Sequence, residues 1–290
     1  VSFIFADIVA SPILNLTAVV KEVTLENKQQ KAEAQSSDEL GQLAESFNTM
    51  MDKINKIDQM RRQFVSNVSH ELRTPIASIK IIAETLIHSK PSEMEVYDDF
   101  MHDINSELDR LNKIIETLLT LVNLEREGLE LEYSQTVVNH LVQKTLDTLA
   151  PLAEKKRISL SLIPDQNVFM LLDGHKIRQC LVNIIGNAIN YTPEGGKVTV
   201  RIDESKEQVA IRVSDTGIGI PKEDLSRIFE RFFRVDSARS RDTGGSGLGL
   251  SIAHQIVLLH EGRIEVESEL HVGTTFVIVL PKRGNLEVGR

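Results

Sequence analysis

The chain has 290 residues, of which 41% are hydrophobic and 26% are charged, and its formal net charge is −9. This is the composition of a globular protein with room for about two domains, and the acidic balance argues against nucleic-acid binding, which needs clustered Lys and Arg. Its single cysteine, Cys180, excludes an internal disulfide framework, and the histidine spacing predicts no transition-metal site.

The first ten residues are apolar but too few to cross a bilayer, which takes about 20 residues. They also lack the basic start of a signal peptide. Because the chain begins at Val1 rather than Met, we expect it to be a fragment. Residues 1–10 are then either the stub of a removed transmembrane helix or a short buried or interfacial helix end.

Apolar residues at spacings of three and four predict helices from residue 12 to beyond residue 86. A short helix spans residues 12–23, and a polar connector follows at 26–38. The next apolar stripe has the spacing of a coiled-coil seam and consists of Leu40, Leu43, Phe47, Met50, Ile54 and Ile57. It runs into a further helix that ends near Pro91.

His70 lies off the apolar stripe of that further helix. The stripe consists of Phe64, Val68, Leu72, Ile76, Ile79, Ala83 and Leu86. At about 100° per residue, His70 points away from this stripe, and Thr74 shares its exposed face one turn later. Glu71 stands beside it as a carboxylate that can take or hold a proton, so the imidazole suits a nucleophile. A surface histidine without function is the plainer alternative.

A second apolar stripe, over residues 97–122, predicts another long helix. Two long helices joined by a short polar turn form an antiparallel hairpin. One face of this hairpin is so apolar that it needs a further partner, and pairing with a second copy into a four-helix bundle is the simplest solution. The pattern therefore predicts an obligate homodimer.

After Gly128 the hydrophobic period alternates between helical and strand-like runs. Helices are predicted at 137–155, 174–191 and 247–260, and strands at 158–163, 168–172, 197–203, 209–214, 263–267 and 275–280. This alternation predicts an α/β sandwich with a mixed sheet.

Two loops of this part suit a nucleotide. Asp215 follows a strand, where its carboxylate can accept a hydrogen bond from an exocyclic amine such as that of adenine, and Gly217 and Gly219 permit close approach of a flat ligand. Ordinary turn chemistry is the alternative. The glycine-rich run 243–250 opens a helix, where free N–H groups make a phosphate cradle. Its alternative is a flexible loop with a glycine cap.

Asn183 and Asn187 lie four residues apart and so share one face of a helix. Amide oxygens are hard ligands suited to holding Mg²⁺ together with nucleotide phosphates. The alternative is a pair of ordinary polar residues. It is weakened because Tyr191, Thr192 and Pro193 end the helix just beyond them.

Six ordered motifs resemble the boxes of bacterial sensor histidine kinases over residues 60–281. They are residues 70–75 (H box), 183–187 (N), 215–219 (G1), 228–234 (F), 245–250 (G2) and 273–276 (G3). Pro12 together with residues 38–50 is similar to the HAMP signal-relay module. The resemblance implies a multidomain fold: an all-α coiled coil and four-helix-bundle dimerisation region, followed by an α/β sandwich ATP-binding domain of the Bergerat (GHKL) type.

The resemblance also implies an organisation. It assigns a transmembrane stub to 1–10, a HAMP-like relay to 11–58, the dimerisation and phosphotransfer hairpin to 59–128, the ATP-binding domain to 129–283 and a tail to 284–290. The expected setting is the cytoplasmic portion of a bacterial membrane protein, attached through a missing transmembrane segment. The expected partners are a second copy and the receiver domain of a cognate response regulator, with no nucleic acid.

Residue roles follow from the same resemblance. His70 is the phosphoacceptor that attacks the γ-phosphate of ATP, with Glu71 as base or orienter, and Thr74 helps place water when the module dephosphorylates its partner. Asn187 binds Mg²⁺, and Asp215 reads the adenine amine. The remaining members of the implied nucleotide site are Asn183, Tyr191, Gly217, Gly219, Phe232, Phe233, Gly245, Gly247, Leu248, Gly249, Thr274 and Thr275.

Within this set, Gly245, Gly247 and Gly249 are expected to cover the phosphates as part of a mobile lid, and Phe232 and Phe233 to anchor its near side. The implied function is ATP-dependent autophosphorylation of a histidine and phosphotransfer to a response-regulator aspartate, together with phosphatase activity toward the regulator.

One position departs from the family. Lys or Arg usually follows the metal-binding asparagine by three residues, whereas this chain has Asn190. The lost cation would weaken nucleotide binding or transfer unless Arg178, Arg231 or Arg234 replaces it. This leaves open an alternative function, a phosphatase-dominant or scaffold module that uses the ATP pocket as a conformational sensor.

A third class, the ATP-hydrolysing chaperones and type II topoisomerases of the same fold, carries a glutamate at the Asn183 position as general base for water. An amide cannot act in that way, so the sequence disfavours hydrolysis.

Overall fold

The computed structural model describes residues 13–14, 17–18, 39–89, 94–126, 128–163, 166–235 and 246–282. The chain divides into two compact units, Val1–His70 and Glu71–Arg290. The expected stub at 1–10 and tail at 284–290 lie outside the described residues, as do most of the expected helix at 12–23 and the connector. Within the described ranges, no helix is long and apolar enough to span a membrane.

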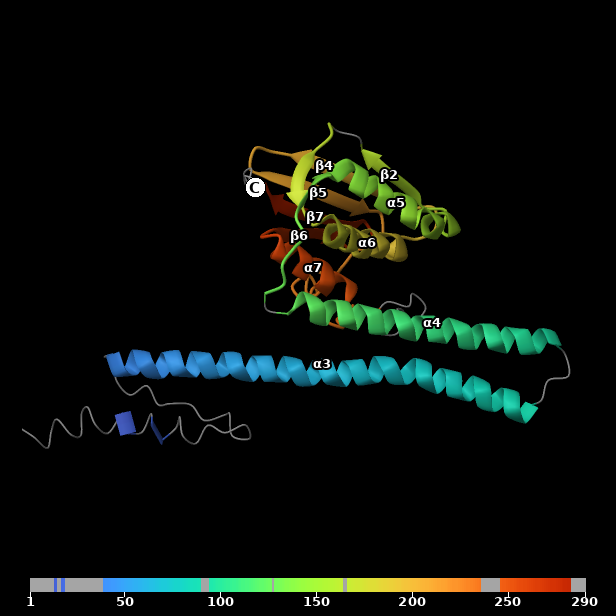
Figure 1. Cartoon of the computed structure of the whole chain (residues 1–290), viewed down its shortest axis with the longest axis horizontal. Helices are drawn as coiled ribbons and strands as arrows, with labels where there is room; N and C mark the ends of the chain where they lie inside the picture. Colours follow the sequence, from blue (N-terminus) through green and yellow to red (C-terminus); the bar gives the residue numbers. More distant parts are fainter. Residues whose placement is uncertain are drawn as a thin grey trace, which may run out of the picture. The chain divides into compact units, whose positions relative to one another are not determined.

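A single helix, α3 (Glu39–Ser89), joins two of the predicted helical segments without a break (Figure 1). Ala44 and Met51 are buried. Several positions of the predicted apolar stripes remain exposed to solvent in the single chain: Leu43, Met50, Ile54, Ile57 and Ile76.

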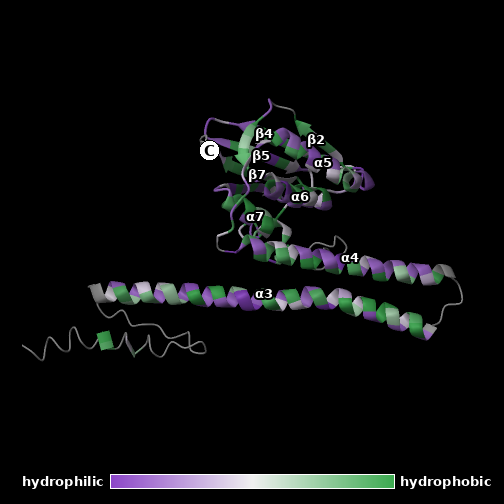
Figure 2. Cartoon of the chain, viewed as in Figure 1, coloured by the Kyte–Doolittle hydropathy of each residue, from purple (hydrophilic) through white to green (hydrophobic). Residues whose placement is uncertain are grey.

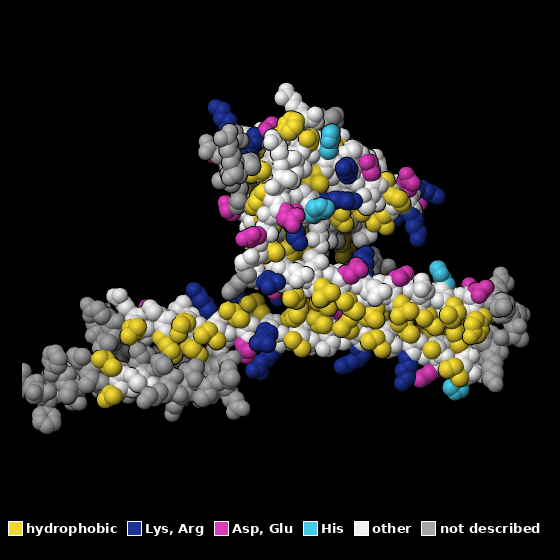
Figure 3. Space-filling view, in the orientation of Figure 1, with side chains coloured by type: hydrophobic (Ala, Val, Ile, Leu, Met, Phe, Trp, Pro, Cys, Tyr) yellow, Lys and Arg dark blue, Asp and Glu magenta, His cyan; other side chains and the backbone are white. Residues whose placement is uncertain are grey.

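The second long helix, α4 (Met94–Leu124), has the predicted amphipathic pattern, and hydrophobic and hydrophilic residues alternate along both long helices (Figure 2). Ile114, Leu121 and Leu124 are buried. Other apolar side chains stay at the surface, where they gather along the helices (Figure 3): Tyr97, Met101, Leu108, Ile115, Leu119 and Val122. Contiguous apolar surface of this kind marks an interaction face.

The α/β part is built on a five-stranded sheet in the order β2-β4-β5-β7-β6. The strands are β2 (Ser159–Ile163), β4 (Lys197–Glu204), β5 (Gln208–Asp215), β6 (Arg263–Glu269) and β7 (Gly273–Pro281). β2 runs parallel to β4, and the other pairs are antiparallel. The predicted mixed sheet is therefore confirmed.

Three helices lie on one face of this sheet: α5 (Val138–Lys155), α6 (Gly174–Tyr191) and α7 (Gly249–Leu259) (Figure 1). Alternate residues of the strands are fully buried, such as Val200 of β4 and Ile211 of β5. Many of their neighbours on the opposite face are polar, such as Arg201, whose Nε lies 2.8 Å from Asp203 Oδ1. Helices packed on one face of the sheet give a two-layer sandwich.

Two short strands form a separate sheet, in which β1 (Ser134–Val137) pairs antiparallel with β3 (Phe169–Leu172). The sequence predicted the second of these as part of the mixed sheet, which is wrong, and did not predict the first. β3 pairs with β1, which leads directly into α5, so its ladder hydrogen bonds are made outside the main sheet.

Candidate functional site

Asp215 is the last residue of β5, and its carboxylate is fixed by backbone groups. Oδ1 accepts the N–H of Gly217 at 2.8 Å and the N–H of Thr274 at 3.2 Å. Within the described part of the chain, Oδ2 accepts no hydrogen bond. Burial raises the pKa of Asp215 above its ordinary value, while the two backbone hydrogen bonds act to lower it. The carboxylate thus has one oxygen bound to the protein and one available to a ligand.

Three glycines let the backbone pack closely around Asp215 and the loop that follows it. A Cβ on Gly217 would lie 2.6 Å from Asp215 Oδ1 and 2.7 Å from Tyr191 O. A Cβ on Gly273 would lie 2.0 Å from Asp215 O. Gly219 has φ +71°, and its Cβ would lie 2.1 Å from a backbone oxygen of β6. Only glycine tolerates such contacts.

Two threonines at the start of β7 adjoin the same loop. Thr274 is buried, and its Oγ1 lies 2.9 Å from Ser268 Oγ, which also accepts the N–H of Ile220 at 2.8 Å. Thr275 Oγ1 donates to Ser214 Oγ at 2.9 Å. No local pattern predicts Ser268, because its place depends on the β6–β7 register that pairs it with Thr274.

Helix α6 carries the two asparagines, and its ends agree with the sequence. Asp173 caps the N-terminus, where Oδ1 accepts two backbone N–H groups of the first turn at 3.0 and 3.1 Å. Asn183 and Asn187 are half-buried. Tyr191 ends the helix and is exposed.

The start of α7 approaches the asparagine side of α6. A Cβ on Gly249 would lie 3.4 Å from Asn183 Oδ1. Leu248 is fully buried, and Gly247 has φ +69°. A Cβ on Gly249 at this distance would be in ordinary van der Waals contact, so the first turn of α7, with its unsatisfied N–H groups, lies beside the Asn183 amide oxygen. Gly245 lies outside the described residues.

The predicted phenylalanines lie beside this glycine run. Phe232 N donates to Gly247 O at 2.9 Å, and Phe232 has φ +63°, which is unusual for a bulky residue. The guanidinium of Arg227 lies over the ring of Phe233, 4.4 Å from its centroid. The structure thus joins the phenylalanine segment to the glycine run through backbone contact.

The donor set fits a hard cation such as Mg²⁺. Asn183 and Asn187 offer neutral amide oxygens, which hard cations accept together with phosphate and water oxygens. In the described ranges, no group of three or more His, Cys, Asp or Glu side chains could hold a metal ion. Two neutral amides leave the charge of such a cation uncompensated, which suits a site that also holds an anionic ligand.

His70 is exposed on α3, in agreement with its position off the apolar stripe. Thr74, one turn later, is also exposed, and Glu71 is half-buried. The boundary between the two compact units falls between His70 and Glu71. The imidazole is open to solvent, where another domain or molecule can reach it.

Two of the arginines considered as replacements for a cation at Asn190 have other partners. Arg178 Nη2 donates to Thr148 Oγ1 at 3.1 Å, and Arg231 forms an ion pair with Glu125. Arg234 is half-buried and stays a candidate.

Sequence reasoning missed a polar cluster at the start of α6. The ring of His260 is buried, and its Nε2 accepts the N–H of Asp173 at 3.2 Å. Asp173 Oδ2 accepts the N–H of Glu132, and the Tyr133 ring meets His260 edge-on at 5.7 Å. These residues hold the segment before β1 against α6. No local pattern predicts this, because His260 lies 87 residues from Asp173.

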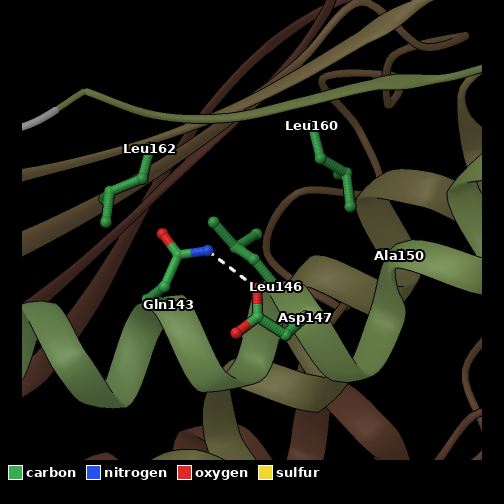
Figure 4. Close-up of a pocket in the computed structure, with 6 residues that line it drawn as sticks. All are labelled: Gln143, Leu146, Asp147, Ala150, Leu160 and Leu162. Carbon is green, nitrogen blue, oxygen red and sulfur yellow. Dashed lines mark hydrogen bonds between the residues drawn. The ribbon is translucent and has the colours of Figure 1, made fainter.

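A separate groove of about 280 Å³ lies between α5 and β2 (Figure 4). Gln143 Nε2 donates to Asp147 Oδ1 at 2.8 Å at its edge. None of the predicted site residues lines it. The lining residues are Gln143, Leu146, Asp147, Ala150, Leu160 and Leu162.

Three regions match known protein families: residues 4–56 the HAMP domain, residues 60–127 the His Kinase A (phospho-acceptor) domain, and residues 172–284 the histidine kinase-, DNA gyrase B-, and HSP90-like ATPase. The sensor histidine kinase WalK of Bacillus subtilis is 37% identical over 80% of this chain. ArlS of Staphylococcus aureus, a signal transduction histidine-protein kinase, is 32% identical over 96% of it. The chain belongs to the bacterial sensor histidine kinases.

This sensor histidine kinase spans 38% of the length of WalK and 62% of that of ArlS. Full-length ShkA, solved in complex with AMPPNP, is 26% identical with a TM-score of 0.57, and the match covers 77% of this chain and 46% of ShkA. A helical N-terminal region followed by a GHKL-type α/β ATPase domain is thus confirmed as the fold class.

Proposed function

We propose that this histidine kinase binds ATP with Mg²⁺ in its α/β part and transfers the γ-phosphoryl group to His70, from which it passes to an aspartate of a response regulator. The proposal rests on the geometry of the Asp215 carboxylate. Its Oδ1 is held by two backbone N–H groups and its Oδ2 is available, which suits the exocyclic amine of adenine. The complex of the related ShkA with AMPPNP supports a nucleotide at this fold.

The phosphates would lie at the glycine run and the start of α7. Helix N-termini and glycine-rich loops bind phosphate through unpaired N–H groups, and the start of α7 lies beside Asn183, with the Cβ position of Gly249 3.4 Å from Asn183 Oδ1. Asn187, with Asn183 in support, would hold Mg²⁺, which when bound neutralises charge on the phosphate oxygens. Because phosphoryl transfer depends mainly on positioning and charge neutralisation, these residues form the main catalytic equipment of the α/β part.

In the transfer step, a ring nitrogen of His70 attacks the γ-phosphorus. The N–P bond forms as the bond from phosphorus to the β,γ-bridging oxygen breaks, and ADP leaves with that electron pair. Glu71 takes the ring proton or orients the ring. Thr74, exposed one turn later, would place the water that removes the phosphoryl group from the regulator.

The amide at Asn183 distinguishes this site from that of an ATP hydrolase. A carboxylate at this position could activate water, whereas a neutral amide cannot accept the proton. Bound ATP is therefore kept for transfer to His70.

The assembly we propose is a homodimer in which the exposed apolar faces of α3 and α4 pair into a four-helix bundle. This arrangement would cover Leu108, Ile115 and Val122, which are exposed in the single chain. A HAMP-like relay over 11–58 would connect a preceding membrane anchor to the phosphotransfer hairpin at 59–128 and the catalytic domain at 129–283.

Labelled ATP tests this function directly. Incubation of the chain with [γ-³²P]ATP and Mg²⁺ should give an acid-labile phosphoprotein, and His70→Gln should abolish the label. Label that persists in His70→Gln would contradict the assignment of the phosphoacceptor.

A second candidate is a phosphatase-dominant module that uses nucleotide binding as a conformational signal. It is favoured by Asn190, together with the engagement of Arg178 and Arg231 by other partners. It predicts nucleotide binding without a phosphohistidine, and loss of regulator dephosphorylation in Thr74→Ala.

A further inference from the structure

The end of α6 carries carbonyl groups that its own helix cannot satisfy. A helix leaves its last four C=O groups without intrahelical donors, and the residue four after Ile189 is Pro193, which has no N–H. Lys156 supplies the donors. Its Nζ lies 2.9 Å from Ile189 O, 2.8 Å from Asn190 O and 2.8 Å from Thr192 O. An ammonium has three N–H groups, and the three carbonyls engage all of them.

Lys156 reaches these carbonyls from the turn that follows α5. Its side chain is half-buried, and burying an ammonium is unfavourable unless it is hydrogen-bonded. A positive charge at a helix C-terminus is also favoured by the helix dipole. In addition, Lys156 O accepts the N–H of Gly195 at 3.2 Å. Both the backbone and the side chain of Lys156 therefore hold the turn after α6; we call these contacts the Lys156 clamp.

The carbonyl of Tyr191 lies in the chain between two acceptors of the clamp, and it holds the loop after Asp215. Tyr191 O accepts the N–H of Ile218 at 3.2 Å, and a Cβ on Gly217 would lie 2.7 Å from the same oxygen. One short stretch of backbone is thus fixed by Lys156 and in turn fixes the loop.

We propose that Lys156 is a positioning residue of the nucleotide site, which acts by holding the end of α6 and, through the Tyr191 carbonyl, the loop 215–219. The identity of the ligand rests on the proposed function; the contacts themselves do not. Since the effect passes through the loop at Asp215, loss of the clamp lowers the affinities for AMP, ADP and ATP by a similar factor. The rate of phosphoryl transfer at saturating ATP is left unchanged.

The test compares Lys156→Met and Lys156→Arg with Lys155→Met, which removes the adjacent, exposed lysine. Hydrogen exchange of the Ile218 amide reports on the loop without any ligand. Lys156→Met should speed this exchange, because three charge-assisted hydrogen bonds are lost. It should also lower the affinities for ADP and for AMP by about 10-fold each. Autophosphorylation at saturating ATP should stay within about twofold. Lys156→Arg should restore part of the loss, and Lys155→Met should match the wild type.

Each outcome decides the proposal. Unchanged exchange at Ile218 in Lys156→Met overturns it, whatever the nucleotide data show. Faster exchange with unchanged ADP and AMP affinity makes the contact purely structural and also overturns the positioning role. If Lys156→Met does not fold, Lys156→Gln, which keeps two N–H donors, replaces it in the same measurements of Ile218 exchange and of ADP and AMP affinity. A wild type that binds no ADP contradicts the proposed function instead, and exchange at Ile218 still decides whether the clamp holds the loop.

Discussion

Asp215 Oδ1 accepts the backbone N–H of Thr274 at 3.2 Å, although the two residues lie 59 positions apart in the chain. The β5–β7 register, which pairs Ser214 with Thr275, brings them together. A second bond, from Gly217 N, fixes the same oxygen. The orientation of the carboxylate is therefore set by backbone N–H groups of β7 and of the turn after β5.

Asp215→Asn should weaken ADP and ATP binding by about 10- to 100-fold, the worth of a hydrogen bond to a charged group. The amide can still accept both backbone N–H groups at Oδ1, but its NH₂ then replaces the acceptor oxygen that faces the ligand amine. Isothermal titration calorimetry measures the change. Affinity equal to that of the wild type would contradict the assignment of Asp215.

The same variant should change how stability depends on pH. Burial raises the folded-state pKa of Asp215 above its unfolded value, so between these two values the folded state keeps a proton that the unfolded state has lost. The unfolding free energy of the wild type then falls as pH rises through this window. Asn does not titrate, so Asp215→Asn should gain stability relative to the wild type as pH rises. Urea unfolding at several pH values measures this, and the opposite trend would contradict it.

Gly273→Ala should destabilise the α/β part by about 1–3 kcal/mol or more, because Gly273 has φ +140° and its Cβ would lie 2.0 Å from Asp215 O. Gly186→Ala is the matched control. A Cβ there meets nothing within 4 Å inside α6, so alanine should stabilise the helix by about 1 kcal/mol. Denaturant unfolding compares the two, and equal effects would contradict the described backbone.

Cys180 should resist alkylation in the folded chain, since it is fully buried and burial raises the pKa of its thiol. As the single cysteine, it reports unfolding of the α/β part alone. Iodoacetamide labelling in mild urea should slow when ADP is added, because a ligand of the folded state reduces opening. Rapid labelling in native buffer would contradict the burial.

Ile115→Lys should weaken self-association. Ile115 belongs to the exposed apolar face of α4, and a lysine in a bundle interior would bury a charge. Lys113→Ala, on the same helix, is the control and should remain dimeric. Sedimentation equilibrium distinguishes the two variants, and an Ile115→Lys dimer as tight as that of the wild type would exclude this face from the interface.

Local sequence signals predicted most of the elements. The bounds of α6 follow from the Asp173 cap and from Thr192-Pro193, which stop the helix at Tyr191. By contrast, α7 begins two residues later than predicted, because Gly247 has positive φ and Leu248 precedes the helix as its cap. The sequence does not predict β1, because this strand has only four residues and little apolar pattern.

The site could be predicted only as far as residue types reveal chemistry. The sequence and its family resemblance predict Asp215, Gly217 and Thr274 as site residues, and the structure brings them together. They do not predict Ser268 and Lys156, because the partners of these residues depend on strand register or on a turn 33 to 36 residues distant. Long-range hydrogen bonds of this kind leave no periodic trace in a sequence.

The phosphoacceptor is tested most directly by mapping the phosphoryl group after incubation with ATP and Mg²⁺. His88 provides the control, since it is a second exposed histidine on α3. A phosphoramidate is expected on the peptide that contains His70; it should be lost in His70→Gln and retained in His88→Gln. A phosphoryl group on any other residue, or one that survives in His70→Gln, would contradict the role of His70 as phosphoacceptor.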